Sequence, residues 1–219
     1  MSTFSALSEL LFPTRCLGCR TLGLRICSQC RSSWNPHIYR SNLSVAHRSV
    51  PVYSAVPYSP VAQKVLLGSK ESALLDADQL ITQALTHSLS YMHREIGIAD
   101  LVPVPSRKSA TRKRGRDFIS DQSNLLARSP QVMVRSILHH QRHVRDQSAL
   151  NVHEREINLH GSLHCANRAT VENIPVIIVD DLLTSGATLR EAARVLFYAG
   201  YEVIGAVTAC VAKPLRYTQ

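Results

Sequence analysis

The chain has 219 residues, of which 45% are hydrophobic, so it is long enough for one substantial core and too apolar to be disordered. It has no apolar run of the ~20 residues that cross a bilayer, and residues 1–12 lack the basic start of a secretory signal, so we expect a cytoplasmic protein without membrane insertion. The formal net charge is +9, but only 5% of residues are aromatic, so a base-stacking platform for single-stranded nucleic acid is not evident.

Three segments precede the first predicted strand. Residues 1–12 carry apolar side chains at helical spacing and predict a short helix. Residues 13–34 contain four cysteines, and residues 35–49 are polar and irregular, which predicts a linker. We therefore expect residues 1–34 to form a small N-terminal module.

The four cysteines form two Cys-x-x-Cys pairs, Cys16 with Cys19 and Cys27 with Cys30. Each pair can bring two thiolates to one metal ion, and four thiolates complete a tetrahedral zinc site with no open position for catalysis. We predict a structural zinc knuckle. Disulfides are an alternative that is rare in a cytosolic protein, and an iron–sulfur cluster is a further alternative.

From about residue 50 onward, predicted strands and helices alternate. The expected strands are 50–56, 100–104, 132–138, 174–179 and 202–209. The expected helices are 61–67, 75–94, 121–128 and 189–198. This alternation predicts an α/β fold with a doubly wound, mainly parallel sheet. We expect the domain to span residues 50–219, with a helical or hood part over 50–98 and the core over 99–212.

Part of the positive charge lies in one segment between residues 107 and 116. Such a cluster can neutralise the phosphates of a nucleic acid or of a small ligand, although a charge run is more commonly a solvated loop. The candidates for nucleic-acid contacts are Arg112, Lys113, Arg114 and Arg116.

Residues 176–188 carry the most informative functional pattern. The apolar run 176–179 predicts a strand that is buried on both faces, and Asp180 and Asp181 follow it. Open α/β sheets bind ligands beyond the carboxyl ends of their strands. Two carboxylates at this place can accept hydrogen bonds from vicinal hydroxyls or lie near a magnesium ion.

A small polar loop then leads into the next predicted helix. Its backbone N–H groups and hydroxyls suit a phosphate, and its glycine permits close approach of a ligand. The strand, the acidic pair and this loop together predict a phosphorylated sugar as ligand. Neither a Walker loop nor G-x-G-x-x-G is present, so sites for a nucleotide triphosphate or a dinucleotide are not expected. An ordinary strand and turn is the alternative, but two carboxylates there are costly without a ligand. The loop residues are Thr184, Ser185, Gly186, Ala187 and Thr188.

Residues 176–188 closely resemble the signature of type I phosphoribosyltransferases, which bind 5-phosphoribosyl 1-pyrophosphate (PRPP). With the knuckle in front, the whole chain resembles the ComF family of competence proteins. Residues 100–108 resemble the Val-Pro-Val-Pro segment of that family, and residues 145–161 its Arg-x-x-x-Gln-x-x-Leu…Arg…Asn-Leu-x-Gly segment. The family's Arg-Gly-Phe-Asn-Gln motif is half kept, because Arg114-Gly115 continues as Arg116-Asp117-Phe118.

The resemblance implies how PRPP would lie. Asp180 and Asp181 would contact the ribose 2- and 3-hydroxyls, the loop 184–188 would hold the 5-phosphate, and magnesium would accompany the ligand. The loop after the first core strand would hold pyrophosphate, through Ser106, Arg107 and Lys108.

The resemblance also implies a mobile lid before the acidic pair, which would exclude water from an oxocarbenium-like C1. Its residues would be Arg145, Gln147 and Arg155, for which a solvated loop is the alternative. The candidates for catalysis are Arg145, Asp180 and Asp181.

Two functional hypotheses follow from the resemblance. The first is a PRPP-binding protein of the ComF type that handles incoming single-stranded DNA in natural transformation, with DNA-uptake or helicase proteins as partners. The alternative is an active phosphoribosyltransferase that moves phosphoribose from PRPP to an acceptor and releases pyrophosphate. Residues 35–98 contain no recognisable motif that reads a base. A PRPP-sensing regulator ranks last, because a knuckle stands where such regulators carry a winged helix.

Overall fold

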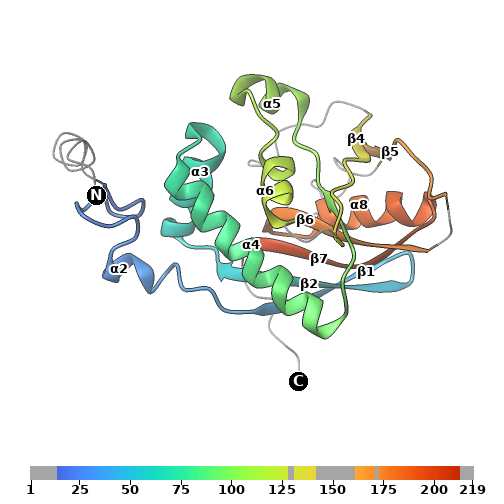
Figure 1. The fold of residues 1–219 in the computed structure, drawn as a ribbon, viewed down its shortest axis with the longest axis horizontal. Coiled ribbons are helices and arrows are strands. Elements are labelled where there is room, and N and C mark those ends of the chain that lie inside the picture. The colour runs from blue at the N-terminus through green and yellow to red at the C-terminus, as the bar shows by residue number, and fades with distance from the viewer. Residues whose placement is uncertain (1–13, 128–130, 142–160, 171–172, 213–219) are drawn as a thin grey trace.

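The computed structural model of the chain describes residues 14–127, 131–141, 161–170 and 173–212 (Figure 1). The helix expected over residues 1–12 lies outside the described residues, as does the lid segment with Arg145, Gln147 and Arg155. Among the helices that are described, none is long and apolar enough to cross a membrane.

Five strands form the central sheet, in the order β1-β2-β7-β6-β3. All neighbouring pairs are parallel except β1 and β2, which are antiparallel. This sheet confirms the predicted α/β fold with a mainly parallel sheet. The strands are β1 (Tyr39–Val45), β2 (Arg48–Pro57), β3 (Asp100–Pro103), β6 (Ile174–Leu183) and β7 (Tyr201–Val211).

Helices cover both faces of this sheet, as Figure 1 shows. Along β6, Ile177 and Val179 pack in the core cluster of α3 (Pro60–Ser72), α4 (Leu75–Glu95) and α6 (Phe118–Leu126). Val176 and Ile178 pack in the opposite cluster, which contains α8 (Ala187–Tyr198). Successive side chains of a strand point to opposite faces, so a strand between two helical layers must be apolar at every position.

Smaller elements complete the described part of the chain. The short helix α2 (Ser28–Arg31) belongs to the cysteine-rich segment, and α5 (Lys108–Arg114) follows β3. A two-stranded antiparallel sheet is formed by β4 (Leu138–His140) and β5 (Leu163–Cys165). α5 was not expected, because its basic residues indicated a loop.

The predicted linker over residues 35–49 is wrong, because β1 lies within it. Ser41, Leu43 and Val45 are buried while the residues between them are exposed, which is the alternation of a strand with one solvent face. The hairpin turn consists of Ala46 and His47, whose φ angles are 48° and 63°. Two-residue hairpin turns with positive φ usually contain glycine or asparagine, so this turn carries no sequence signal.

Three other element boundaries differ from the prediction. The strand expected over 132–138 reduces to a single bridge between Val134 and Leu101, followed by β4. Helix α6 begins at Phe118 rather than at residue 121. Strand β6 continues to Leu183 and stays paired with β7 up to that residue. The acidic pair therefore lies within the strand, near its carboxyl end, instead of after it.

Candidate functional site

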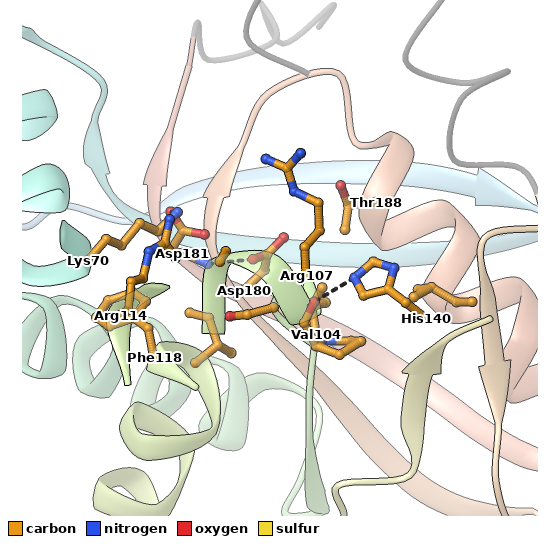
Figure 2. Close-up of a pocket in the computed structure, with 14 residues that line it drawn as sticks. Lys70, Val104, Arg107, Arg114, Phe118, His140, Asp180, Asp181 and Thr188 are labelled. Carbon is orange, nitrogen blue, oxygen red and sulfur yellow. Dashed lines mark hydrogen bonds and ion pairs between the residues drawn. The ribbon is translucent and has the colours of Figure 1, made fainter. Parts of the chain in front are cut away.

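Asp180 and Asp181 line one pocket of about 170 Å³ at the carboxyl end of β6 (Figure 2). The pocket lies where α3, the loop after β3, α5, α6, the small sheet and the start of α8 meet. The backbone N–H of Asp181 donates to Asp180 Oδ1 at 2.9 Å. This bond orients the Asp180 carboxylate, and both acidic residues line the same pocket.

The acidic pair carries an electrostatic cost. Burial and the neighbouring Asp181 carboxylate raise the pKa of Asp180 well above its usual value, although Lys70 opposes the shift. Asp181 is 7% exposed, and its Oδ2 lies 2.5 Å from Lys70 Nζ. Two buried like charges are expensive, which favours a ligand that donates hydrogen bonds or brings positive charge.

The loop between β6 and α8 places a helix N-terminus at the same pocket. Gly186 has φ 77°, and a Cβ added there would lie 2.6 Å from Leu43 Cδ2, so both conformation and space require glycine. The carbonyl of Ser185 accepts a hydrogen bond from Arg190 Nη2 at 2.8 Å. Of the five predicted loop residues, Thr188 lines the pocket. The N-terminus of a helix favours an anion at this position.

The loop after β3 forms another wall. Ser106 and Arg107 line the pocket, and Lys108 is the first residue of α5. Ser106 Oγ donates to Asp117 Oδ1 at 3.0 Å, and His140 Nε2 donates to the Pro105 carbonyl at 3.1 Å. The structure therefore brings the loop after β3 and the acidic pair to one cavity.

The comparison with protein families agrees with this geometry. Residues 110–218 match the family model described as the phosphoribosyl transferase domain. The chain contains a phosphoribosyltransferase domain. The matched region includes β6, the polar loop and α8, whereas α3, Ser106 and Arg107 precede it. No curated protein matches the chain.

Sequence reasoning missed several residues that line the pocket of the phosphoribosyltransferase domain. They come from elements that only tertiary packing brings to β6, so no local motif marks them. Lys70 lies on α3, outside the matched region, and Phe118 and Ile119 form a buried apolar wall. The missed polar residues are Lys70 and His140, whereas Arg114 was expected to contact nucleic acid and lines the pocket instead.

The basic segment is partly occupied by ion pairs within the chain. Arg114 Nη2 lies 2.5 Å from Glu71 Oε1, and Arg116 donates to both oxygens of Asp78. These two arginines face the protein, whereas Arg112 and Lys113 are exposed. Of the four candidates for nucleic-acid contacts, Arg114 and Arg116 are thus engaged by acids of the chain, and exposed Lys113 lies 3.8 Å from Glu71 Oε2.

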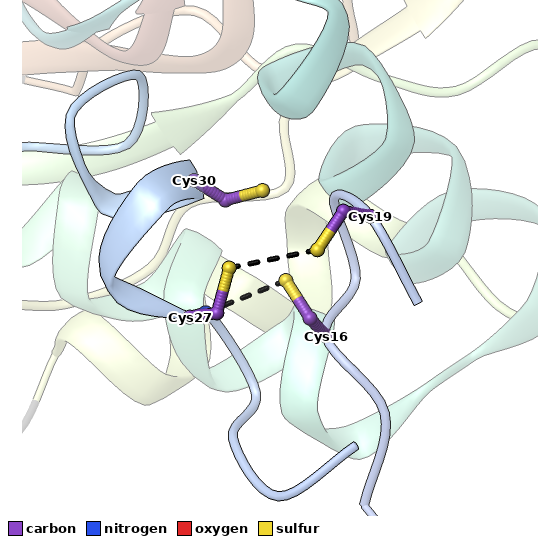
Figure 3. A group of neighbouring side chains, drawn as sticks. All are labelled: Cys16, Cys19, Cys27 and Cys30. Atoms are coloured by element: carbon purple, nitrogen blue, oxygen red, sulfur yellow. Dashed lines mark hydrogen bonds between the residues drawn. The ribbon is translucent and has the colours of Figure 1, made fainter. Parts of the chain in front are cut away.

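The four cysteines in front of the phosphoribosyltransferase domain converge on one point (Figure 3). The sulfurs of Cys16, Cys19, Cys27 and Cys30 lie within 4.8 Å of one another, and those of Cys19 and Cys27 are 3.5 Å apart. A tetrahedral ion with bonds of about 2.3 Å requires sulfurs about 3.8 Å apart. The arrangement therefore could hold a zinc ion.

The ionisation of these thiols supports a metal. Burial opposes thiolate formation at Cys16, but backbone N–H groups, including those of Cys19 and Cys27, lower its pKa to about 6. Burial and the other three thiols raise the pKa of Cys30 to about 12. The cluster cannot readily hold four thiolates alone, and a divalent cation would remove that conflict.

The cysteine cluster packs directly on the helices of the α/β domain. Lys64 Nζ on α3 donates to the Gly18 carbonyl at 2.6 Å, and Arg25 Nε lies 2.8 Å from Asp76 Oδ1 on α4. Cys16, Cys30 and Trp34 belong to the same core cluster as α3 and α4. The knuckle thus shares its core with the domain that follows.

Proposed function

We propose that the protein binds PRPP in the pocket at the end of β6. The observation that carries the proposal is the adjacent pair Asp180 and Asp181 beside the start of α8, within a phosphoribosyltransferase domain. The ribose hydroxyls would donate to the two carboxylates, and the 5-phosphate would bind the loop 184–188. The pyrophosphate would extend toward Ser106, Arg107 and Lys108, and Arg145 would act from the lid.

Calorimetric titration with PRPP and magnesium tests this proposal. Asp180→Asn and Asp181→Asn keep the shape of each side chain but remove its charge, so each should reduce PRPP affinity at least roughly tenfold. Arg94→Ala, an exposed change at the far end of α4, serves as the control. Unchanged affinity in both asparagine variants would contradict the assignment of the site.

We further propose that the protein is of the ComF type and handles single-stranded DNA in the cytoplasm during natural transformation, together with DNA-uptake or helicase proteins. The proposal is supported by the cysteine cluster and the phosphoribosyltransferase domain in one chain. Arg112 and Lys113 would contact DNA phosphates, because they are the exposed members of the basic segment.

Fluorescence anisotropy with a labelled oligothymidylate at several salt concentrations tests the DNA proposal. Removing Arg112 and Lys113 together should reduce the slope of log affinity against log salt by roughly 1.4, since each phosphate contact to a single strand contributes about 0.7. Arg94→Ala should leave the slope unchanged. A slope that the double variant does not alter would refute contact through these residues.

An alternative proposal is an active phosphoribosyltransferase. The buried apolar wall of Phe118 and Ile119 beside the acidic pair favours it, because a planar acceptor could pack there. Pyrophosphate release from PRPP, measured over a panel of nucleobases and amines, separates the two functions. PRPP binding without release of pyrophosphate would support the binding function and contradict the enzyme.

The proposal includes two metal ions. Cys16, Cys19, Cys27 and Cys30 would hold zinc, which stabilises the fold and leaves no open position for chemistry. Magnesium would accompany PRPP and neutralise part of its phosphate charge.

A further inference from the structure

Lys70 reaches the acidic pair from the last turn of α3. Its Nζ lies 2.5 Å from Asp181 Oδ2, and its side chain is 26% exposed on the pocket wall (Figure 2). It precedes the region that matches the phosphoribosyltransferase model, so it is supplied from outside that region. An ammonium group in this position partly neutralises two adjacent carboxylates, of which Asp181 is buried.

The backbone around Lys70 is held on both sides. The Ser69 carbonyl accepts from Arg116 Nη2 at 3.0 Å, and the Glu71 carboxylate pairs with Arg114 at 2.5 Å. These contacts fix the last turn of α3 against α5 and the segment that follows it. The four-carbon stem of Lys70 can therefore redirect its ammonium group without a movement of the helix.

The other surroundings of the ammonium group do not hold it in one place. Its nitrogen lies 6.0 Å from the ring centroid of Phe118, the outer limit of a cation–π contact. The pocket wall carries three basic side chains, Lys70, Arg107 and Arg114, and two acidic ones. The wall is thus suited to a ligand with more than one anionic group.

The position of Lys70 defines a second end of the pocket. In Figure 2, Thr188 and Arg107 lie on one side of Asp180, while Lys70, Arg114 and Phe118 lie on the other. A phosphate at the start of α8 would occupy the Thr188 side. The pyrophosphate on C1 would then lie between Arg107 and Lys70, beside Asp180, so that both cations could contact it.

We infer that Lys70 exchanges partners when the phosphoribosyl ligand binds, which rests on the proposed function. In the structure its ammonium group pairs with Asp181. In the complex a ribose hydroxyl donates to the carboxylate in its place, and Lys70 binds the anionic group on C1 of the ribose. The exchange keeps a partner beside the Asp181 carboxylate at every stage and gives the added anion a charged donor.

Lys70→Met tests the inference, because it keeps the length of the side chain and removes the charge. Affinities for PRPP and for ribose 5-phosphate, which lacks the C1 anion, are compared by calorimetry. PRPP affinity should fall roughly tenfold to a hundredfold, whereas ribose 5-phosphate affinity should change much less. Lys64→Met is the matched control, since Lys64 lies on the same helix but bonds the Gly18 carbonyl.

The outcomes separate this inference from the proposed function. Equal losses for both ligands in Lys70→Met would show that the ion pair only supports the fold, and would overturn the exchange. Inorganic pyrophosphate is a third probe. The wild-type protein could bind pyrophosphate but not PRPP, while Lys70→Met binds neither. In that case the proposed function fails, but the role of Lys70 in anion binding holds. If the wild-type protein binds none of the three probes, both proposals fail.

Discussion

Arg116 donates two hydrogen bonds to Asp78, at 2.7 and 2.8 Å, and so joins the segment after α5 to the start of α4. Both side chains are largely buried, at 22% and 14% exposed. A third hydrogen bond reaches the Ser69 carbonyl on α3. Arg116 therefore connects three segments that surround the pocket, and its charge serves the fold.

Asp78→Asn should lower the free energy of unfolding by about 1–3 kcal/mol, because it leaves the largely buried Arg116 without its charged partner. Urea denaturation measures the change. Asp76→Asn is the comparison, since Asp76 pairs with Arg25 at a more exposed site and should cost about 0–1 kcal/mol. Equal costs for the two variants would contradict the importance of burial.

The same pair predicts a dependence of stability on pH. Burial alone would raise the pKa of Asp78, but hydrogen bonds from Arg116 and Ser69 outweigh it and hold that pKa below its usual value. A lowered pKa in the folded state contributes stability above the unfolded pKa of about 3.9, and the contribution is lost as pH falls through the folded pKa. The stability difference between wild type and Asp78→Asn should therefore shrink below about pH 4.

Gly186→Ala should destabilise the protein more than Gly115→Ala. Both glycines have positive φ, at 77° and 72°, so both variants incur a left-handed backbone strain of about 1–2 kcal/mol. Only at Gly186 would the new Cβ meet another residue, Leu43 Cδ2 at 2.6 Å, whereas nothing lies within 4 Å at Gly115. Thermal denaturation of the two variants separates strain from steric conflict. Equal losses would show that β1 moves aside without cost.

Local patterns predicted the parts of the site that are contiguous in sequence. The acidic pair and its loop follow directly from the apolar strand, and the four cysteines follow from two short pairs. Lys70 could not be predicted in this way, because its contact with Asp181 depends on how α3 packs against the sheet. β1 was missed because its solvent-facing residues are polar and its turn, Ala46 and His47, contains no usual turn residue.

The orientation of the charged side chains could not be predicted from the sequence either. The sequence shows that residues 112–116 are basic, but it does not show which way their side chains point. The acids that pair with Arg114 and Arg116 lie on α3 and α4. Glu71 is separated from that run by the whole of α4 and β3, and Asp78, in the first turn of α4, by most of α4 and by β3. A basic segment therefore identifies phosphate-contact candidates only after its partners in the fold are known.

Asp180→Asn should stabilise the ligand-free protein at neutral pH while it weakens PRPP binding. Burial and Asp181 raise the pKa of Asp180, so the folded state favours the protonated form. The cost of the charged form is absent below the unfolded pKa of about 3.9 and grows as pH rises toward the raised folded pKa. Melting temperatures at pH 7 should therefore rise in the variant, with a smaller difference near pH 4.

Asp181→Asn provides the control for this prediction. It removes the same charge repulsion but also breaks the ion pair with Lys70, which would then lack its partner at 2.5 Å. We expect less stabilisation than in Asp180→Asn. A lower melting temperature of Asp180→Asn at pH 7 would show that the carboxylate is compensated in the ligand-free pocket.

The cysteine cluster should contain one zinc ion per chain, measured by elemental analysis of the purified protein. Cys30→Ser should lose the metal because three thiolates leave an incomplete tetrahedral site, whereas Cys165→Ser, a change far from the cluster in the small sheet, should retain it. The only tryptophan, Trp34, reports the consequence. Its backbone N–H bonds the Cys30 carbonyl, and its side chain is 3% exposed, so chelation should shift its emission to longer wavelength. Bound iron, or four cysteines that resist alkylation until a reductant is added, would refute the zinc assignment.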